Sequence, residues 1–290
     1  MKVYIDGTFC DKEDAKVSVF DHGLLYGDGI FEGIRFYHGK VFRFKEHIDR
    51  LFDSARSICL QIPLSKEKLI EAVLETIRCN KLQDGYIRLI ITRGIGNLGL
   101  DPARCSHPTI VIIADSIQLY PPEMYEKGLK VVTCATRQVS SAALSPMVKS
   151  LNYLNNIMAK IEAVQAGAGE GLMLNEQGFV AECTGDNIFI IKNGRMTTPP
   201  LAAGGALGGI TRAVIFELAQ NLHIPLNEND ITRHEIFVAD ECFLTGTAAE
   251  VIPVIDLDSR PIGDGTPGPI TRRLTQAFHQ LTQSTGTAIY

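Results

Sequence analysis

Residues 26–37 read Tyr-Gly-Asp-Gly-Ile-Phe-Glu-Gly-Ile-Arg-Phe-Tyr. We predict a strand over this segment, with its glycines at bends or at places where another group comes close. Upstream, Val3 and Ile5 alternate with polar residues before the turn dipeptide Asp6-Gly7, which predicts a hairpin at the start of the chain.

The rest of the sequence alternates between helical and β-rich segments. Apolar residues recur at helical spacing in 48–58, 69–77, 151–166 and 214–222, and a last helix is expected from Pro269. The predicted strands are 87–92, 109–114, 130–134, 171–175, 179–182 and 242–244. A second hairpin is predicted at Asn193-Gly194. Short turns join several of the β-rich segments, so the sheets are expected to be at least partly antiparallel.

The segment 116–128 contains Pro121-Pro122 and little periodicity, which makes it the best linker candidate. A chain of 290 residues is long enough for two medium domains. We therefore expect a small N-terminal domain over 1–117, an interdomain loop over 118–130 and a large domain over 131–290.

Composition excludes several classes of protein. Hydrophobic residues make up 45% and charged residues 21%, a soluble globular balance, and the net charge of -5 argues against nucleic-acid binding. Seven scattered cysteines without a Cys-x-x-Cys pair argue against a disulfide framework and against a zinc site, so no metal is expected. There is no apolar signal core and no apolar run of ~20 residues, so we expect a cytoplasmic protein without a membrane partner.

Lys149 is a candidate nucleophile. It lies in the segment 145–153, between an apolar pair and the predicted start of a helix. The positive end of a helix dipole favours a neutral amine, which is the form that attacks a carbonyl to make an imine. The alternative is an ordinary solvated lysine.

Other segments could supply a carboxylate to a site or bind an anion. Glu182 ends a predicted strand before a small-residue turn and could point into a cleft, although a solvated glutamate is the usual case. The segment 208–211 opens a helix, 246–249 follows a strand, and Arg50 borders an apolar helix seam, so each could bind an anion. An ordinary glycine loop with Thr211 as N-cap, a plain turn and a snorkelling arginine are the alternatives.

Tyr86 and Arg88 lie on one face of a predicted strand, because side chains alternate with period two. Both could bind a carboxylate, and a solvated strand face is the alternative.

The order and spacing of these motifs resemble the fold-type IV pyridoxal 5'-phosphate (PLP) enzymes, and within them the branched-chain amino acid aminotransferases. The matching segments are 26–35, 86–88, 149–155, 182–189, 207–212 and 243–250. They span nearly the whole chain. The resemblance implies an α/β fold with mixed sheets, in which two domains meet at the site and 131–290 is the cofactor-binding domain.

The resemblance also implies a role for each matching residue. Lys149 is similar to the Schiff-base lysine, Glu182 to the carboxylate that pairs with the pyridine nitrogen, and Tyr153 to the tyrosine that contacts the ring oxygen. The implied cofactor-binding residues are Arg50, Lys149, Tyr153, Glu182, Asn187, Leu207, Gly209, Ile210, Thr211 and Thr247. The implied substrate-binding residues are Phe31, Gly33, Arg35, Tyr86, Arg88, Leu98, Gly99, Leu100, Thr247 and Ala248. Tyr153 follows Lys149 by four residues, where some members of the family have five.

The loop 98–100 resembles one that a neighbouring subunit lends to the site, which implies a homodimer or a higher homo-oligomer. The implied reaction transfers the amino group of Leu, Ile or Val to 2-oxoglutarate. A D-amino-acid or (R)-amine transaminase and an aminodeoxychorismate lyase, which have the same fold, are the nearest alternatives. A non-catalytic binding protein and a cofactor-free lysine imine enzyme belong to other classes, and both would be colourless.

Overall fold

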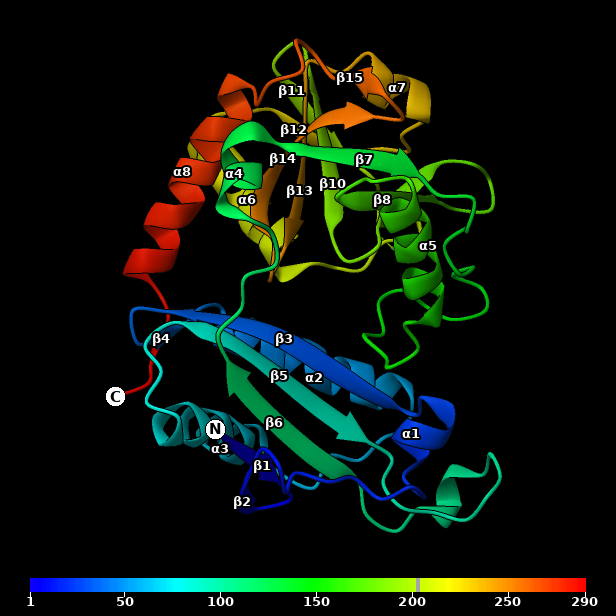
Figure 1. The fold of residues 1–290 in the computed structure, drawn as a ribbon, viewed down its shortest axis with the longest axis vertical. Helices are drawn as coiled ribbons and strands as arrows, with labels where there is room; N and C mark the ends of the chain where they lie inside the picture. Colours follow the sequence, from blue (N-terminus) through cyan, green and yellow to red (C-terminus); the bar gives the residue numbers. More distant parts are fainter. Residues whose placement is uncertain (202–203) are drawn as a thin grey trace. The chain divides into compact units, whose positions relative to one another are not determined.

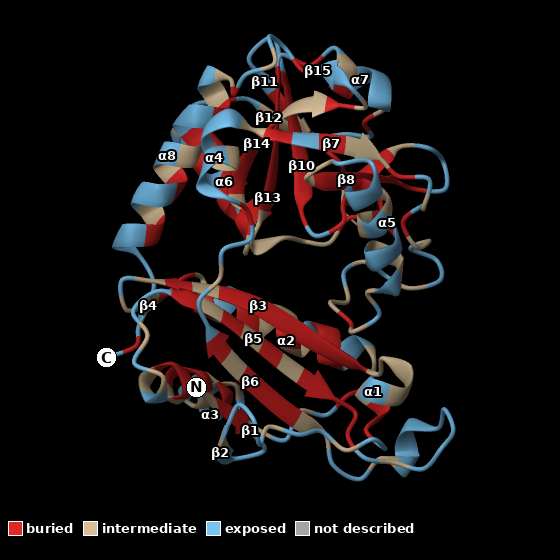
Figure 2. Cartoon of the chain, in the orientation of Figure 1, coloured by how far each residue is buried: buried red, intermediate tan, exposed pale blue. Residues whose placement is uncertain are grey.

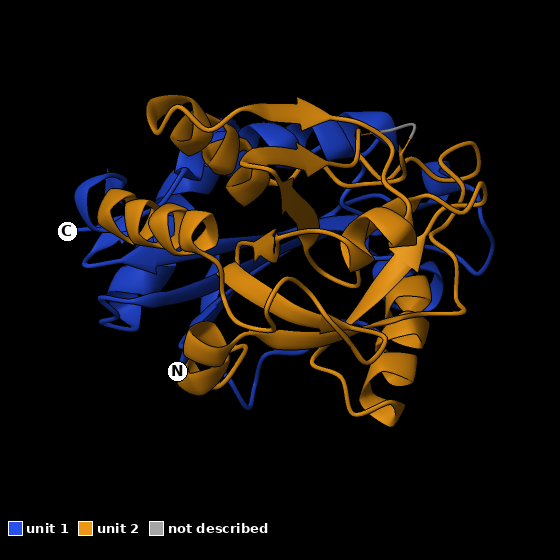
Figure 3. Ribbon diagram, turned by 90° about the horizontal axis from the view of Figure 1, so that it is seen from above, with its two compact units in different colours: residues 1–117, 148–152, 282–290 blue, residues 118–147, 153–281 orange. Residues whose placement is uncertain are grey.

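The computed structural model describes residues 1–201 and 204–290, which combine helices with two β-sheets (Figure 1). The chain divides into two compact units (Figure 3). Unit 1 comprises 1–117, 148–152 and 282–290, and unit 2 comprises 118–147 and 153–281. Each unit has its own sheet and its own apolar core. The predicted class, α/β with mixed sheets, is confirmed.

The sheet of unit 1 has the strand order β16-β4-β3-β5-β6-β1-β2, and its described pairs are antiparallel. The strands are β1 (Lys2–Ile5), β2 (Thr8–Asp11), β3 (Gly29–Tyr37), β4 (Lys40–Val41), β5 (Gly85–Thr92), β6 (Thr109–Asp115) and β16 (Thr287–Ala288). The predicted hairpin at the start of the chain is therefore confirmed, as are the predicted strands 87–92 and 109–114.

Two predicted helices of unit 1 are also confirmed, as α2 (Phe44–Ser57) and α3 (Lys66–Cys79). Their apolar faces share one core with residues such as Ile34 and Ile87 on the sheet. Figure 2 shows β3 buried along most of its length. Ser65 caps α3, because its side chain accepts a hydrogen bond from the backbone N–H of Lys68.

The sheet of unit 2 has the strand order β12-β11-β10-β13-β14-β7-β8-β9, with β15 beside β14. The strands are β7 (Leu129–Thr133), β8 (Glu170–Leu174), β9 (Val180–Cys183), β10 (Asn187–Lys192), β11 (Arg195–Thr198), β12 (Leu226–Glu228), β13 (Glu241–Gly246), β14 (Glu250–Leu257) and β15 (Arg260–Pro261). The pairs β11–β12, β14–β7 and β7–β8 are parallel, and the others are antiparallel. The predicted Asn193-Gly194 hairpin joins β10 to β11, and both turn residues have positive φ.

The helices after residue 118 are α4 (Pro122–Lys127), α5 (Leu154–Gln165), α6 (Ile210–Asn221), α7 (Arg233–Phe237) and α8 (Pro269–Ser284). The helix predicted over 151–166 begins later than expected, at Leu154. The segment 116–128 is not wholly irregular, because it contains α4. Proline is favourable at the first position of a helix, so α4 can begin at Pro122.

A short helix, α1 (His22–Tyr26), precedes β3, so the predicted strand begins at Gly29 and not at Tyr26. The side chain of Asp21 accepts a hydrogen bond from the backbone N–H of Gly23 at 2.7 Å and caps this helix. Gly27 then adopts a left-handed conformation, with φ of 70°, and ends it. Unit 1 also contains the 3-10 helix η1 (Pro102–Arg104) between β5 and β6.

The predicted large domain, 131–290, contains two segments that pack in unit 1. The segment 148–152 runs beside β3, where the backbone N–H of Phe31 donates to the carbonyl oxygen of Lys149 at 3.0 Å. At the end of the chain, β16 pairs with β4. Local sequence does not identify such partners, because both pairings join residues that lie far apart in the chain.

Candidate active site

Lys149 is held in unit 1 by its main chain. Its backbone N–H donates to the hydroxyl of Ser54 on α2 at 3.1 Å, and its carbonyl oxygen accepts from Phe31 on β3. Its ammonium nitrogen lies 4.7 Å from the centre of the Phe31 ring. Helix α5 begins only at Leu154, so the helix start predicted directly after Lys149 is wrong.

The predicted substrate residues of β3 and β5 share one face of the unit 1 sheet. Gly33 is paired with Arg88 and Arg35 with Tyr86, and Phe31 follows the same alternation along β3. The guanidinium carbon of Arg88 lies 4.6 Å from the centre of the Phe31 ring. The face therefore combines cationic groups with aromatic rings.

Gly33 leaves space for the hydroxyl of Tyr86. A Cβ atom at this position would lie 1.9 Å from the Tyr86 hydroxyl oxygen. A larger residue in this place would displace the Tyr86 side chain, so the glycine keeps room for a predicted substrate residue.

A fully buried carboxylate, Glu32, projects from β3 toward α2. Arg50 binds both of its oxygens, through Nε at 2.7 Å and Nη2 at 2.8 Å, and His47 Nδ1 lies 2.8 Å from Oε2. Burial would raise the pKa of Glu32, but Arg50 and His47 outweigh it and lower this pKa to about 2. Burial lowers the pKa of His47, and the charges of Arg50 and Lys149 add to this effect against the opposing pull of Glu32.

Sequence reasoning did not identify this Glu32–His47–Arg50 cluster. His47 and Arg50 are three residues apart on α2, so they lie on one side of the helix, and this spacing was the available signal. The structure gives Arg50 an ion pair with Glu32; the phosphate contact expected for Arg50 stays a prediction.

The loop 98–100 is anchored to α1. His22 Nε2 lies 2.8 Å from the carbonyl oxygen of Asn97, and the backbone N–H of Gly99 donates to the Tyr26 hydroxyl at 2.9 Å. Leu98 and Leu100 remain 73% and 80% exposed. The loop is thus held at Asn97 and Gly99 while both leucines face solvent.

In unit 2, Glu182 is buried near the end of β9 and is not the solvated glutamate considered as its alternative. Its Oε1 accepts from Gln138 Nε2 at 2.8 Å, and its Oε2 accepts from the backbone N–H of Leu207 at 2.9 Å and from Asn187 Nδ2 at 3.4 Å. Asn187 also donates to the carbonyl oxygen of Leu207 at 2.9 Å. Both oxygens of the carboxylate are therefore oriented by donors.

The N-terminus of α6 forms the predicted glycine-rich helix start. Gly209 is its N-cap, so Thr211 lies inside the first turn and is not the capping residue considered as an alternative. A Cβ atom on Gly209 would lie 2.1 Å from Asn187 Oδ1, so a larger residue here would displace the Asn187 side chain. The first backbone N–H groups of a helix have no partner within the helix and can bind an anion.

The turn after β13 carries Thr247 and Ala248. Gly246, the last residue of β13, lies close to the side chain of Asp186. A Cβ atom on Gly246 would lie 1.9 Å from Asp186 Oδ1. Among the described residues, the buried hydroxyl of Thr245 has no hydrogen-bond partner, although buried hydroxyls usually have one. A bound group that offers acceptor oxygens would satisfy it.

Tyr153 is the N-cap of α5, and its carbonyl oxygen accepts from the backbone N–H of Ile157 at 2.9 Å. The structure therefore fixes the main chain of this residue. Its predicted contact with a cofactor ring stays a prediction.

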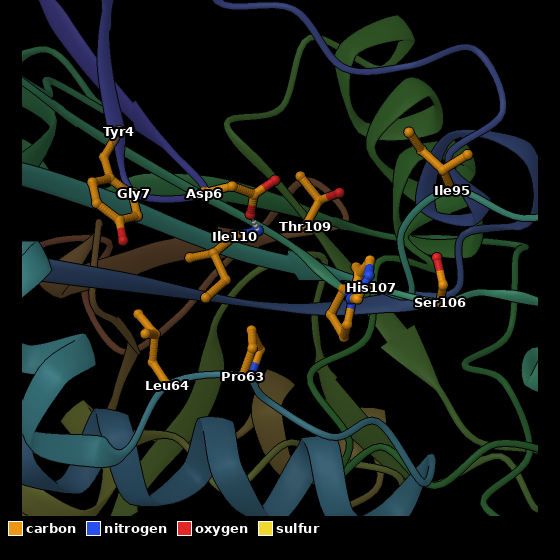
Figure 4. Close-up of a pocket in the computed structure, with 11 residues that line it drawn as sticks. Tyr4, Asp6, Gly7, Pro63, Leu64, Ile95, Ser106, His107, Thr109 and Ile110 are labelled. Atoms are coloured by element: carbon orange, nitrogen blue, oxygen red, sulfur yellow. Dashed lines mark hydrogen bonds between the residues drawn. The ribbon is translucent and has the colours of Figure 1, made fainter.

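Figure 4 shows a pocket in unit 1 between the β1–β2 turn, the α2–α3 connection and the segment that leads into β6. Its lining includes Asp6, Leu64, Ile95, His107 and Ile110, and it contains none of the predicted site residues. We therefore do not assign the pocket to the candidate active site.

Residues 29–257, which are most of the chain, match the family model for class IV amino-transferases. The chain belongs to this family. The resemblance inferred from the six motifs is thereby confirmed.

Relatives of this class IV aminotransferase cover its whole length. A Methanocaldococcus jannaschii protein is 52% identical over 100% of this chain and 99% of its own. The structure of the branched-chain amino acid aminotransferase of Escherichia coli superposes with a TM-score of 0.94 at 36% identity, over 97% of this chain and 94% of that one. The branched-chain amino acid aminotransferase of Thermobaculum terrenum, solved in its PLP form, gives a TM-score of 0.88 at 28% identity, over 97% of this chain and 94% of that one.

Within residues 1–201 and 204–290, no three His, Cys, Asp or Glu side chains gather into a group that could hold a metal ion. In the same residues, no helix has the length and apolar character needed to cross a membrane.

Proposed function

We propose that the protein is a PLP-dependent aminotransferase that transfers the amino group of Leu, Ile or Val to 2-oxoglutarate and forms 2-oxo acids and L-glutamate. The observation that carries the proposal is the full-length match to branched-chain amino acid aminotransferases, in sequence and in fold. The same matches do not favour the D-amino-acid, (R)-amine or lyase alternatives.

The residues of unit 2 fit a phosphorylated pyridine. The α6 N-terminus, with Ile210 and Thr211, supplies donors for a phosphate, and Thr247 would add its hydroxyl from the turn after β13. The partnerless hydroxyl of Thr245, two residues before Thr247, supports an acceptor-rich ligand there. Glu182, oriented at both oxygens, would accept a hydrogen bond from a protonated ring nitrogen.

When bound, PLP supplies an aldehyde that bonds to amines and a cationic ring that withdraws electrons. Lys149 would hold the cofactor through its amine, and after the substrate amine takes its place it would remove the proton from the substrate Cα. Tyr153 would donate to the ring oxygen. Glu182 would keep the ring nitrogen protonated, because an adjacent carboxylate stabilises a cation.

The face of the unit 1 sheet would bind the substrate. Phe31 offers an apolar surface for a branched side chain, while Arg35, Tyr86 and Arg88 offer donors for carboxylates, including the second carboxylate of 2-oxoglutarate. The alternation of donors and rings on one face supports a substrate that is apolar at one end and anionic at the other.

Borohydride reduction followed by peptide mass spectrometry tests the cofactor assignment. We expect phosphopyridoxyl label on the peptide that contains Lys149, and yellow protein before reduction. A panel of L-Leu, L-Ile, L-Val and D-Ala with 2-oxoglutarate tests the substrates, and glutamate is expected from the three L-amino acids. Label at another lysine contradicts the cofactor assignment, and turnover of D-Ala only contradicts the substrate assignment.

We also infer a homodimer or higher homo-oligomer. Helix α5 exposes a stripe of apolar side chains at helical spacing: Leu154, Ile157, Met158, Ile161 and Val164, each between 44% and 70% exposed. Unit 1 exposes Leu98 and Leu100 on the anchored loop. Contiguous apolar surface of this kind marks protein–protein contacts, and a second copy of the chain would cover it.

Ile161→Asp is expected to weaken self-association at least ~10-fold, because it places a charge within an apolar contact. Analytical ultracentrifugation across a concentration series measures the change. Gln220→Asp is the control, since it adds the same charge to an exposed polar position on another helix of the same unit, α6. A monomeric wild-type protein, or equal association of both variants, would contradict the inference.

The cysteines support a reducing compartment such as the cytoplasm. All seven are free thiols in the described structure, and several are exposed or half-buried. Exposed thiols persist where disulfides do not form.

A further inference from the structure

Gln138 lies in the irregular segment after β7, and its side chain is buried in unit 2. Its backbone N–H donates to the carbonyl oxygen of Leu174 at 2.9 Å, which fixes its main chain beside β8. From there Nε2 reaches Oε1 of Glu182 at 2.8 Å. No sequence motif singled out this residue.

The orientation of the Gln138 amide follows from its other contacts. Its Oε1 accepts from Asn155 Nδ2 at 3.3 Å and from the backbone N–H of Val139 at 3.2 Å. Both contacts are donors, so the oxygen of the amide must face them and the NH₂ group must face Glu182. Asn155 is itself tied to the carbonyl oxygen of Arg137 at 3.0 Å.

The carboxylate of Glu182 is thus held from both sides. Gln138 binds Oε1, while Leu207 and Asn187 bind Oε2. A carboxylate with a donor on only one oxygen can still rotate about its terminal torsion, which is broad in proteins. Removal of the Gln138 donor would therefore loosen that torsion while leaving Leu207 and Asn187 on the other oxygen.

We propose that Gln138 is a positioning residue that fixes the carboxylate plane of Glu182 for the ring nitrogen of the cofactor. This inference rests on the proposed function, because it concerns the proposed role of Glu182. Gln138 acts through Glu182 and has no direct part in the chemistry. Its effect is on the fraction of bound cofactor whose ring nitrogen is protonated, and thereby on turnover.

Two substitutions remove the hydrogen bond from Gln138 to Glu182 in different ways. Gln138→Met removes the donor in a similar shape, and Gln138→Asn shortens the side chain by one methylene so that it no longer reaches Glu182. Gln177→Met is the matched control, because Gln177 is an exposed glutamine of unit 2. The measurements are the ¹⁵N NMR signal of bound PLP labelled at its ring nitrogen, kcat and KM for L-leucine, and the melting temperature of the cofactor-free protein.

Either Gln138 variant is expected to move the ¹⁵N signal toward that of unprotonated pyridine and to lower kcat ~10-fold, with KM within about twofold of wild type. Gln177→Met should match wild type in each measurement. If one variant does not fold, the other decides. A lower melting temperature with an unchanged ¹⁵N signal would show a packing role only and overturn the inference. Failure of the wild-type protein to bind PLP at Lys149 would instead overturn the proposed function.

Discussion

Lys149→Arg is expected to lower kcat for transamination by ~10⁴-fold or more, the largest effect of any single change considered for this protein. Arginine keeps a positive charge and a long side chain, but its guanidinium stays protonated and can neither attack an aldehyde nor accept a proton. The main-chain hydrogen bonds from Lys149 to Ser54 and from Phe31 to Lys149 do not involve the side chain. The variant should therefore fold.

Steady-state kinetics with L-leucine and 2-oxoglutarate measure the loss, and the melting temperature checks folding. Lys68→Arg is the control, because Lys68 is an exposed lysine on α3 of the same unit. For Lys149→Ala, addition of a small primary amine should restore part of the activity, since it returns the missing functional group. More than a tenth of wild-type activity in Lys149→Arg would show that another residue carries the chemistry.

Much of each unit was predictable because its signals are local. The apolar spacing of 48–58 and 69–77 predicted α2 and α3, and the β-rich run over 87–92 predicted β5. The turn dipeptide Asn193-Gly194 predicted the β10–β11 hairpin. In each case the neighbours that decide the structure lie within a few residues of one another.

The features that were missed depend on distant partners. Helix α1 is too short for a periodicity signal, and its cap Asp21 also accepts from Thr92, far along the chain, at 2.8 Å. The segment 148–152 belongs to unit 1 because of hydrogen bonds to β3 that no local pattern shows.

In the candidate site, too, local sequence identified some residues and missed those that depend on distant partners. Lys149 and Glu182 were each ambiguous by themselves, and only the order of several motifs along the chain raised them above a solvated lysine and a solvated glutamate. The residues that hold them, Ser54 and Gln138, had no signal, because a hydroxyl on a helix and an amide in an irregular segment fit many roles.

Glu32→Gln is expected to destabilise unit 1 by about 3–5 kcal/mol near neutral pH, the largest stability effect that we predict. The loss arises because Arg50 and His47 lose the carboxylate that binds both of them in a buried environment. Denaturant or thermal unfolding measures the change. Glu46→Gln is the control, since Glu46 lies on α2 but forms an exposed ion pair with Arg43, worth at most ~1 kcal/mol.

The pH dependence of the unfolding free energy tests the Glu32→Gln prediction in a second way. The pKa of Glu32 is about 2 in the folded protein and 4.5 ordinarily, so on acidification the unfolded chain takes up the proton first and stability falls as the pH drops through 4.5 toward 2. The lowered pKa of His47 acts in the same direction and begins below its ordinary value of 6.5. The stability difference between wild type and Glu32→Gln should therefore be full at pH 7 and shrink steadily below pH 4.5. A difference that is constant from pH 7 to pH 3 would show that the carboxylate charge does not stabilise the cluster.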